Sequence, residues 1–327
     1  MKYKYNYIIF GDNSWSSFFF HDLKVMENVR YLSTPSANIP SKIGKLLCKA
    51  AFSPRRSAIT HRIAFCLIKK QMLDFNFGND NPVCYVFMDR HHLLYNNYAL
   101  IRYIKRKKTK NRTILYMLDL VSRNNDLDVN YAKRVFDLII TYDKGDSIKY
   151  DWPYLSTPFS FIDVPPLEAP PCDVYFCGYA KNRIKDIMKA YYICHRLGLK
   201  CQFFIKDCPQ EYQINTDDIY YDVNMSYFEN IRHVRNSKCI LEIMQKGADG
   251  FTPRLWEAIM YNKHLITNNE QIRESPYYYE KGCHFMENLE KGYPLDPTLL
   301  LSPIVYPQEI KKLLSPQSLI DMIDQNL

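Results

Sequence analysis

Continuous apolar runs alternate with longer amphipathic stretches in the first half of the chain. Three of these runs end directly before Gly11, Asp89 and Asp119. Apolar strands separated by helices indicate a parallel sheet that helices cover on both faces. The predicted strands are 7–10, 83–88, 113–118 and 136–141, and the predicted helices include 94–105 and 130–135.

The alternation stops at residues 157–171, where five prolines occur in 15 residues. Proline disfavours both helix and central strand, so we interpret this segment as a linker between domains. The alternation resumes beyond it, and the sequence therefore predicts two α/β domains, 1–160 and 161–327. The second contains strands 173–176, 201–205, 239–244 and 264–267, helices 183–197, 227–235 and 255–261, and a C-terminal helix, 315–327, that could pack back across the domains.

The segment from Gly247 to Ala258 carries the clearest chemical signal. It follows a predicted buried strand and precedes a predicted helix. Thr252 is suited to the N-cap of that helix and Pro253 to its first position. A turn of this kind directs free backbone N–H groups, and the positive end of the helix dipole, toward an anionic ligand.

Two acids flank this turn. Asp249 precedes it, and Glu257 follows after seven intervening residues, one helical turn beyond Pro253. The spacing favours carboxylates that hold sugar or ribose hydroxyls while the backbone amides hold phosphate. An ordinary α/β turn with solvated acids is the alternative.

The segment from Asp249 to Ala258 resembles the donor-binding signature of retaining GT-B glycosyltransferases, in which an acid, seven residues and a glutamate follow one another. The chain departs from the family pattern in two places. Asp249 stands where the family has glutamate, and Arg254 stands where it usually has an apolar residue. The resemblance covers about the last half of the chain well and the first half by pattern only.

A glycine near the start of the second domain extends the resemblance. In the family, a basic pair after this glycine neutralises the donor diphosphate, and Lys181 and Arg183 follow Gly178 here. The family commonly has arginine directly after the glycine, where this chain has Tyr179. A helix start with solvated basic residues is the alternative. The resemblance implies donor binding by Gly178, Lys181, Arg183, Asp249, Gly250, Phe251, Thr252, Arg254 and Glu257.

The expected acceptor side lies at the strand ends of the first domain. His91 and Asp119 are the candidate catalytic residues there, and His91 or His92 could act on the acceptor hydroxyl or orient the sugar. In retaining transferases of this fold the leaving phosphate is generally thought to serve as the base, so these roles stay open. We expect no cofactor and no metal. A single glycine in the first turn, Phe10–Trp15, disfavours a nicotinamide-binding domain.

Composition is compatible with a two-domain globular protein. The chain has 327 residues, 47% of them hydrophobic, and no apolar run long enough to span a bilayer. No apolar signal-peptide region follows Met1. The ten cysteines contain no C-x-x-C pair, which favours reduced core residues of a cytosolic protein and makes a zinc site unexpected.

The net charge of +8 is concentrated in the first domain, where residues 42–112 hold 16 basic and three acidic side chains. Such a field attracts anionic lipid, nucleic acid or acidic polymers. In 42–51, apolar residues share one helical face and lysines another, which is typical of an interfacial helix and also of a core helix with solvated lysines. The summed charge favours a membrane surface, and no nucleic-acid-binding motif is present.

Together these features predict two Rossmann-like α/β domains facing a cleft, as in GT-B enzymes. The expected activity is transfer of a sugar from a nucleotide-sugar donor to a lipid-linked surface glycan, as in lipopolysaccharide or other polysaccharide biosynthesis, in the cytoplasm and on the inner face of the plasma membrane. A non-catalytic glycan- or nucleotide-sugar-binding relative and a basic α/β nucleic-acid-binding protein are the alternatives. Donor hydrolysis and salt-dependent RNA binding would separate them.

Overall fold

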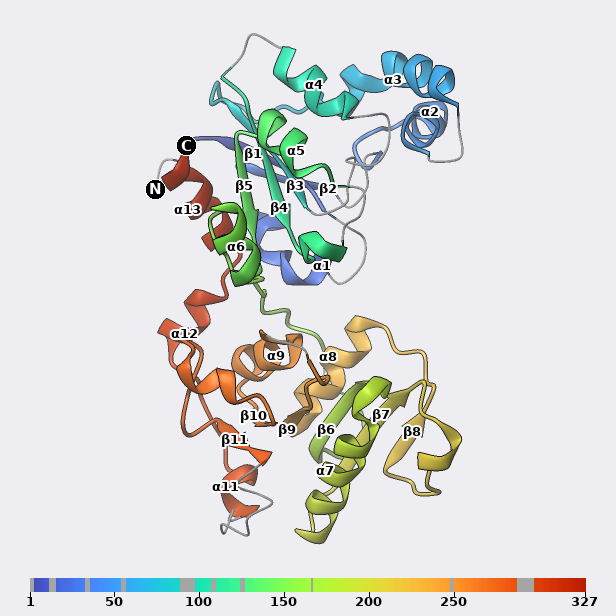
Figure 1. Cartoon of the computed structure of the whole chain (residues 1–327), viewed down its shortest axis with the longest axis vertical. Helices are drawn as coiled ribbons and strands as arrows, with labels where there is room; N and C mark the ends of the chain where they lie inside the picture. The colour runs from blue at the N-terminus through green and yellow to red at the C-terminus, as the bar shows by residue number, and fades with distance from the viewer. Residues whose placement is uncertain are drawn as a thin grey trace. The chain divides into compact units, whose positions relative to one another are not determined.

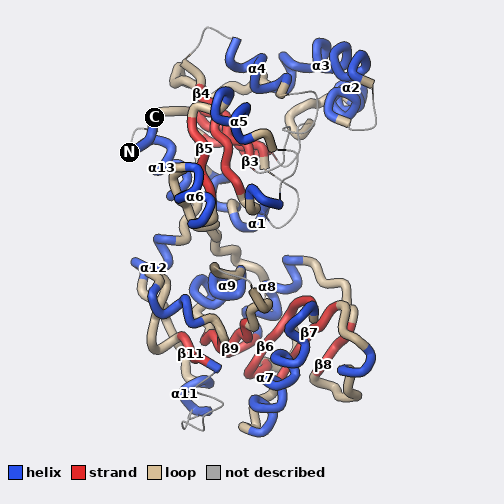
Figure 2. The backbone as a smooth tube through the Cα atoms, in the orientation of Figure 1, coloured by secondary structure: helices blue, strands red, loops and turns tan. Residues whose placement is uncertain are grey.

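The chain forms two α/β units, each built on a parallel sheet (Figures 1 and 2). Unit 1 comprises Met1–Ser160 with Leu314–Leu327, and unit 2 comprises Phe161–Leu313. The structure is a computed structural model, which describes residues 3–11, 16–32, 36–53, 57–88, 98–106, 110–123, 127–165, 167–247, 250–286 and 297–327. The two parallel sheets confirm the predicted α/β class with two Rossmann-like units. That the units face a cleft stays a prediction.

The sheet of unit 1 has the strand order β2-β1-β3-β4-β5, and every pairing in it is parallel. The predicted apolar runs form its central strands because they are buried on both faces. The hydrophobic pattern did not predict β2, a short edge strand with two partly exposed residues. The strands are β1 (Asn6–Phe10), β2 (Val29–Leu32), β3 (Val83–Met88), β4 (Arg112–Met117) and β5 (Leu138–Thr141).

Helices cover this sheet and bury an apolar core against it. Side-chain caps define where several of them begin: Ser41, Ser57, Asp128 and Asp143 each accept a hydrogen bond from a backbone N–H in the first turn. The helices are α1 (Ser16–Phe19), α2 (Lys42–Phe52), α3 (Ala58–Met72), α4 (Ala99–Arg106), α5 (Val129–Val135) and α6 (Lys144–Tyr150).

The C-terminal helix α13 (Gln317–Asn326) groups with unit 1, whereas the sequence assigned residues 161–327 to the second domain. Its apolar face, Leu319, Ile320 and Ile323, is fully buried. The Tyr7 hydroxyl of β1 donates a hydrogen bond to the Asp324 carboxylate of this helix. Burial of this apolar face and the long-range hydrogen bond explain why the end of the chain belongs to the unit in which the chain begins.

The sheet of unit 2 has the strand order β11-β10-β9-β6-β7-β8, again with parallel pairings only. The chain enters at β6, builds outward through β7 and β8, and then builds in the other direction from β9. In open parallel sheets the crevice at such a reversal, outside the carboxyl ends of the strands, is the usual ligand site. The strands are β6 (Cys172–Tyr179), β7 (Cys201–Lys206), β8 (Ile219–Tyr221), β9 (Ser237–Glu242), β10 (His264–Thr267) and β11 (Cys283–Phe285).

A second apolar core lies between this sheet and its helices. The predicted strand 264–267 matches β10, and predicted helix 227–235 matches α8 to within one residue. The helices are α7 (Ile184–Arg196), α8 (Tyr227–Asn236), α9 (Pro253–Tyr261), α11 (Pro297–Leu301) and α12 (Gln308–Leu313). No helix within the described ranges of either unit is long and apolar enough to cross a membrane.

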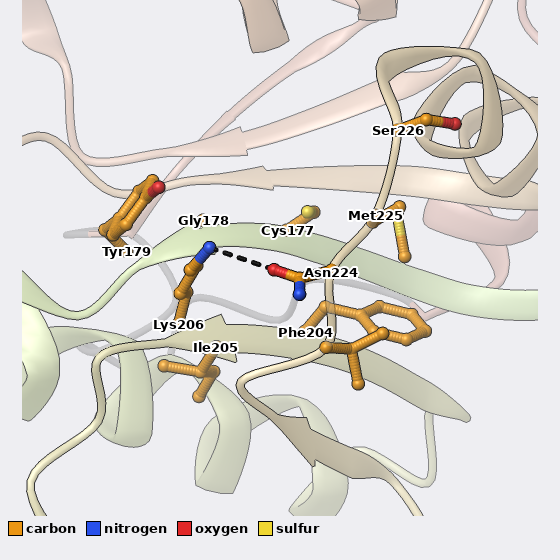
Figure 3. Close-up of a pocket in the computed structure, with 10 residues that line it drawn as sticks. Cys177, Gly178, Tyr179, Phe204, Ile205, Lys206, Asn224, Met225 and Ser226 are labelled. Carbon is orange, nitrogen blue, oxygen red and sulfur yellow. Dashed lines mark hydrogen bonds between the residues drawn. The ribbon is translucent and has the colours of Figure 1, made fainter.

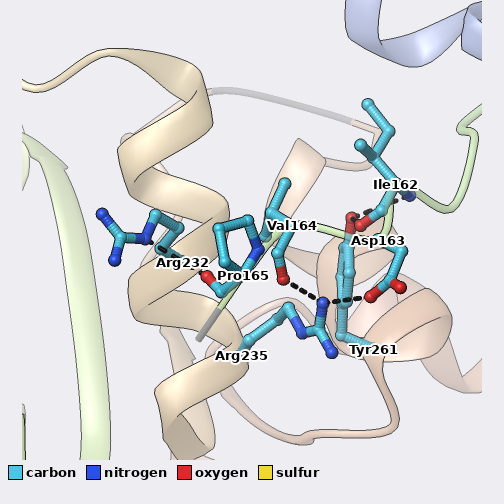
Figure 4. A network of polar contacts seen from close by, with 7 residues as sticks. All are labelled: Ile162, Asp163, Val164, Pro165, Arg232, Arg235 and Tyr261. Carbon is cyan, nitrogen blue, oxygen red and sulfur yellow. Dashed lines mark hydrogen bonds and ion pairs between the residues drawn. The ribbon is translucent and has the colours of Figure 1, made fainter. Parts of the chain in front are cut away.

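Residues 162–165 of the proline-rich segment are hydrogen-bonded to α8 and α9 (Figure 4). The Tyr261 hydroxyl of α9 both accepts a hydrogen bond from the Ile162 N–H, at 3.1 Å, and donates one to the Ile162 carbonyl, at 3.0 Å. Arg235 of α8 pairs with Asp163 and donates to the Val164 carbonyl. Proline has no backbone N–H, so this segment has few donors of its own. Side chains of α8 and α9 supply most of its hydrogen bonds.

Candidate functional site

The candidate site lies at the carboxyl ends of β6 and β9, where the strand order of unit 2 reverses. Helix α9 begins there, as the sequence predicted. Thr252 is its N-cap and accepts a hydrogen bond from the Arg254 N–H at 3.2 Å, and Pro253 occupies the first helical position. Gly250 has a φ of +86°, a conformation that glycine adopts at little cost. The local sequence chemistry therefore fixes where the helix begins and which way its amino end points.

Loop contacts hold the two residues before the cap. The Gly250 N–H donates to Gln271 at 3.1 Å, and Asn269 donates to the Gly250 carbonyl at 2.9 Å. The Phe251 ring packs edge-on against Trp256, with ring centroids 5.7 Å apart. Phe251 is therefore anchored in an aromatic cluster. Asp249, the first acid of the motif, lies outside the described residues.

Gly178, the next to last residue of β6, lies directly beside two guanidinium groups. A Cβ at this position would lie 2.5 Å from Nη2 of Arg254 and 3.1 Å from Nη2 of Arg183. Any larger residue would displace these side chains. The glycine thus leaves room for the two guanidinium groups, and its φ is not in the left-handed region.

Arg183 is only 5% exposed and is held by backbone carbonyls. Its Nε donates to the Tyr179 carbonyl at 3.2 Å, and its Nη1 donates to the Ile243 carbonyl. It thereby joins the end of β6 to the segment that follows β9. Burial, and secondarily the neighbouring Arg254 charge, lowers the pKa of Arg183 to about 10, so the side chain stays cationic at neutral pH.

Arg254 and Lys181 are more accessible than Arg183. Arg254 donates to the Cys177 carbonyl of β6, and its guanidinium lies over the Phe176 ring, 5.5 Å from the centroid. Lys181 is exposed, has a φ of +44°, and places its ammonium 5.9 Å from the centroid of the Tyr179 ring. Of the predicted basic pair, Lys181 is thus open to solvent and Arg183 is buried.

Glu257 lies inside α9 and is 4% exposed. The Tyr227 hydroxyl and the Asn230 amide, both from α8, donate to its Oε1 at 2.8 and 3.0 Å. Burial raises the pKa of Glu257, while Arg254 and these two hydrogen bonds favour the charged form. Both of these hydrogen bonds end on the same carboxylate oxygen, Oε1.

A second carboxyl group, Glu242 at the end of β9, is fully buried beneath the cap of α9. The Thr252 hydroxyl donates to Oε1, and the Thr267 hydroxyl donates to Oε2 at 2.7 Å. Burial raises the pKa of Glu242, and the hydrogen bonds from Thr252 and Thr267 and the charge of Arg254 oppose that shift. The charge of Arg254 thus favours the ionised forms of both buried carboxyl groups, and Glu242 favours the charged form of Arg183.

A pocket of about 310 Å³ opens beside this cluster, over the carboxyl ends of β6 and β7 (Figure 3). Cys177 and Gly178 line both the pocket and the arginine cluster. Lys206 donates to Asn224 at 3.2 Å across the pocket, and its ammonium lies 5.6 Å from the Tyr179 ring. The remaining lining residues are Phe204, Ile205, Val223, Met225 and Ser226.

A chain of hydrogen bonds runs from the pocket to the carboxylate of Glu257. Tyr175 of β6 donates to the Asn230 amide oxygen at 2.9 Å, and the Asn230 nitrogen donates to Glu257. Tyr175 also contacts the sulfur of Met225, which lines the pocket. Tyr175 and Asn230 therefore connect a lining residue of the pocket with Glu257.

The predicted acceptor-side residues lie in unit 1. Asp119 follows β4, is partly exposed, and accepts a hydrogen bond from the Leu120 N–H at 2.9 Å. His91, with His92, lies outside the described residues. Within the described ranges no group of three or more histidine, cysteine or acidic side chains could hold a metal ion.

Sequence reasoning missed several residues of this site. It gave no role to Glu242 or Asn230, and it did not consider Tyr227, Lys206 or Asn224. A position at the carboxyl end of a predicted central strand was the available signal for Glu242, since such ends line the crevice of a parallel sheet. Nothing local marks Asn230 and Tyr227, because their contact with Glu257 joins two helices across the fold.

No protein-family model matches the sequence, and no curated protein matches it. Several solved structures do match. The glycosyltransferase of kitacinnamycin is 8% identical, with 100% of both chains covered and a TM-score of 0.46. The UDP-GlcNAc 2-epimerase of Methanocaldococcus jannaschii, in complex with UDP-GlcNAc and UDP, is 12% identical, with 98% of this chain and 99% of that chain covered and a TM-score of 0.44.

The catalytic domain of starch synthase IV from Arabidopsis thaliana, bound to ADP and acarbose, is 8% identical, with 82% of this chain and 76% of that chain covered and a TM-score of 0.44. At these identities the likeness concerns the GT-B-like fold alone. No residue of the site is assigned from it, and the role of each side chain rests on this chain's own contacts.

Proposed function

We propose that the protein transfers a sugar from a nucleotide-sugar donor that unit 2 binds. The observation that carries this proposal is the buried carboxylate Glu257 in α9, whose charged form is favoured by Arg254 in the first turn of the same helix and by hydrogen bonds from α8. A carboxylate beside a helix amino terminus and cations suits a ligand with both hydroxyl and phosphate groups. The pocket at Cys177–Tyr179, lined also by the Phe204 ring and Lys206, has room for the nucleoside portion.

The roles of the donor-site residues follow from their accessibility. Lys181, Arg254 and the amides at the start of α9 would neutralise the diphosphate, and Arg183 would hold the end of β6 in place beneath them. Oε2 of Glu257 would accept a sugar or ribose hydroxyl. Asp249 keeps the matching role that the resemblance implies. This arrangement stabilises the charge that develops on the departing diphosphate.

In the proposed reaction the bond between the anomeric carbon and the diphosphate oxygen breaks, and its electron pair leaves with the diphosphate. A new bond forms from the acceptor hydroxyl oxygen to the anomeric carbon. With retention of configuration, as the resemblance implies, the departing phosphate oxygen takes the hydroxyl proton. His91 and Asp119 would then orient the acceptor rather than act as the base.

The proposed acceptor is a lipid-linked surface glycan, met at the inner face of the plasma membrane by a cytoplasmic protein. The basic field of residues 42–112 supports this assignment, because anionic lipid or an acidic glycan would be attracted to it. No protein base and no metal is assigned to the reaction.

A thermal-shift screen against UDP-, GDP-, ADP- and CMP-sugars tests the proposal. A donor at about 100 times its dissociation constant should stabilise the protein by about 2.7 kcal/mol. No stabilisation by any of these nucleotides would refute it. Hydrolysis of the stabilising sugar nucleotide then separates a transferase from a binding protein that has lost catalysis. The burial of Arg183 supports the second alternative, the binding protein.

A further inference from the structure

Helices α2 and α3 pack against each other at the edge of unit 1, beside α4 (Figure 1). The Phe52 and Phe65 rings meet edge to face, with centroids 6.0 Å apart. At the other end of the pair, a Cβ on Gly44 would lie 3.2 Å from the side-chain oxygen of Gln71. The pair attaches to α4 through Phe65 and Lys69, which both contact the Tyr103 ring.

Each helix buries one face and exposes a second apolar face. The buried residues of the pair are Gly44, Cys48, Ala51, Phe52, Ala64, Phe65, Ile68 and Met72. Five large aliphatic side chains lie outside this contact: Ile43 at 73% exposed, Leu46 at 66%, Ile59 at 71%, Ile63 at 59% and Leu67 at 60%. The core therefore does not account for the apolar content of these helices.

The exposed aliphatic residues form stripes and are not scattered. Ile59, Ile63 and Leu67 are four residues apart, and Ile43 and Leu46 are three apart, so each set shares one side of its helix. Soluble proteins rarely gather exposed aliphatic side chains in this way unless the surface binds an apolar partner. The sequence grouped Ile43 and Leu46 with Ala51 on one apolar face, but only Ala51 belongs to the core.

The charge of the α2–α3 pair indicates which apolar partner binds to it. No acidic residue occurs between Glu27 and Asp74, and residues 42–72 contain eight lysines and arginines. Lys42, Lys45 and Lys49 are exposed beside the aliphatic stripe of α2. A second copy of the chain would place two basic surfaces against each other, which opposes a dimer through this face. Nucleic acid would satisfy the charge and leave the aliphatic side chains in water.

We propose that the α2–α3 pair docks the protein on an anionic lipid bilayer. The aliphatic stripes enter the boundary between head groups and acyl chains, and the lysines contact lipid phosphates. The inference deepens the proposed function by giving unit 1 a surface for a membrane-bound acceptor. Membrane docking depends only on the α2–α3 pair, so the docking proposal and the proposed function can be refuted separately.

Vesicle flotation with the full chain tests the proposal. The protein should float with vesicles of phosphatidylcholine and phosphatidylglycerol at low salt and stay soluble with phosphatidylcholine alone. The triple change K42S/K45S/K49S should lower partitioning about 100-fold at low salt, because each lysine near anionic lipid contributes about fivefold. Its effect should shrink in high salt, where exposed charges are screened.

The triple change I43S/L46S/I63S is the decisive variant. It keeps every charge and should still lower partitioning at least about tenfold, equivalent to about 1.4 kcal/mol. Ile148→Ser is the matched control, since Ile148 is 85% exposed on α6 of the same unit and has Lys149 beside it. This control should leave flotation unchanged, and all variants should melt like the parent protein.

Three outcomes would overturn the proposal. They are a parent protein that stays soluble with anionic vesicles at low salt, an aliphatic variant that partitions like the parent, and an Ile148→Ser variant that loses as much binding as the triple variant. The second outcome, combined with tight RNA binding by the same variant, would assign the surface to nucleic acid. The thermal-shift screen on the same variants without vesicles reports the donor site independently.

Discussion

The charged side chains at the carboxyl ends of the two sheets differ in how far they are buried. In unit 2, Arg183, Glu242 and Glu257 are withdrawn from water, and the charge of Arg254 acts on all three. In the described part of unit 1, Asp119 follows β4 as a partly exposed side chain, and the concentrated charge lies instead on α2 and α3, far along the chain from that strand end. Desolvating a charged group costs stability unless partners compensate it.

This difference indicates where each unit is adapted to a partner. Carboxyl groups whose pKa values are raised by burial, set against cations at a strand-order reversal, are a feature of ligand and active sites. Exposed lysines next to exposed aliphatic residues are suited to a large surface instead. Unit 2 is therefore organised around a small ligand, and the α2–α3 pair of unit 1 around a surface.

The largest effect is expected from removing the cation whose charge favours the ionised forms of both buried carboxyl groups. Arg254→Met removes that charge and the hydrogen bond to the Cys177 carbonyl, and losing these interactions should cost about 3 kcal/mol. Urea denaturation should show this loss in the free energy of unfolding. The matched variant in unit 1, Lys105→Met, breaks an ion pair with Asp137 that is partly open to water, and should cost at most about 1 kcal/mol. Equal losses in both variants would abolish the distinction between the units.

The next effect concerns ligand binding and not stability. Glu257→Gln preserves shape and removes the charge, so a ligand hydroxyl loses a charge-assisted hydrogen bond worth about 1.5–3 kcal/mol. Stability should hold or rise, because burial disfavours the charged form of Glu257. Calorimetry with the stabilising nucleotide sugar measures the affinity, and a thermal melt of each protein measures the stability. Unchanged affinity with an unchanged melt would show that Glu257 serves α9 alone.

A histidine pair, with His264 buried and His284 partly buried, should make unit 2 sensitive to acid. His264 of β10 and His284 of β11 lie 2.9 Å apart between ring nitrogens, and burial, with the His264 charge second, lowers the pKa of His284 to about 4. An unfolded histidine has a pKa near 6.5, so the folded state binds fewer protons between pH 6.5 and 4. The stability from the neutral pair is complete above pH 6.5 and is lost as pH falls toward 4.

Over that window the loss should reach about 2 kcal/mol, since one pKa unit corresponds to about 1.4 kcal/mol and the His284 side chain is only partly buried. Amide hydrogen exchange, read separately for β10 and for β3, should show faster opening of β10 at pH 5 than at pH 7, with β3 changing less. His284→Gln should flatten the response of β10. Equal acceleration in both strands would place the acid sensitivity elsewhere.

Periodicity predicted the central strands of both sheets because these strands are continuously apolar, and β10 coincides with its predicted range. The strands that were missed, β2, β8 and β11, are short edge strands with mixed exposure. Their formation depends on pairing with a neighbour, which no local pattern encodes. The same reason separates the predictable from the unpredictable residues of the site.

Thr252 and Pro253 were predictable because capping is a local property of the chain. The burial of Arg183 was not, since its acceptor at Ile243 lies 60 residues away in sequence. Glu242 was passed over because its environment is assembled from the α9 cap and from Thr267 of β10. Sequence therefore located the turn and its charges, and tertiary packing decided which of them face a ligand.

The smallest effect should come from Lys181, the exposed member of the predicted basic pair. Its φ of +44° is unfavourable for a residue with a side chain, at about 1 kcal/mol, so Lys181→Gly relieves strain while it adds freedom to the unfolded chain. These two effects nearly cancel, and the free energy of unfolding should change by less than about 0.5 kcal/mol.

Binding should still respond to the lost charge of Lys181. Affinity for the nucleoside diphosphate that stabilises the protein should fall about threefold to tenfold, with the nucleoside itself bound as before, because the ammonium would contact phosphate only. Arg183 stays in place in this experiment, since its removal would disconnect β6 from the segment after β9. Lys185→Ala, an exposed lysine on the following helix, is the control and should change neither affinity. Equal losses for diphosphate and nucleoside would move Lys181 away from the phosphates and leave Arg254 and the α9 amides as the anion site.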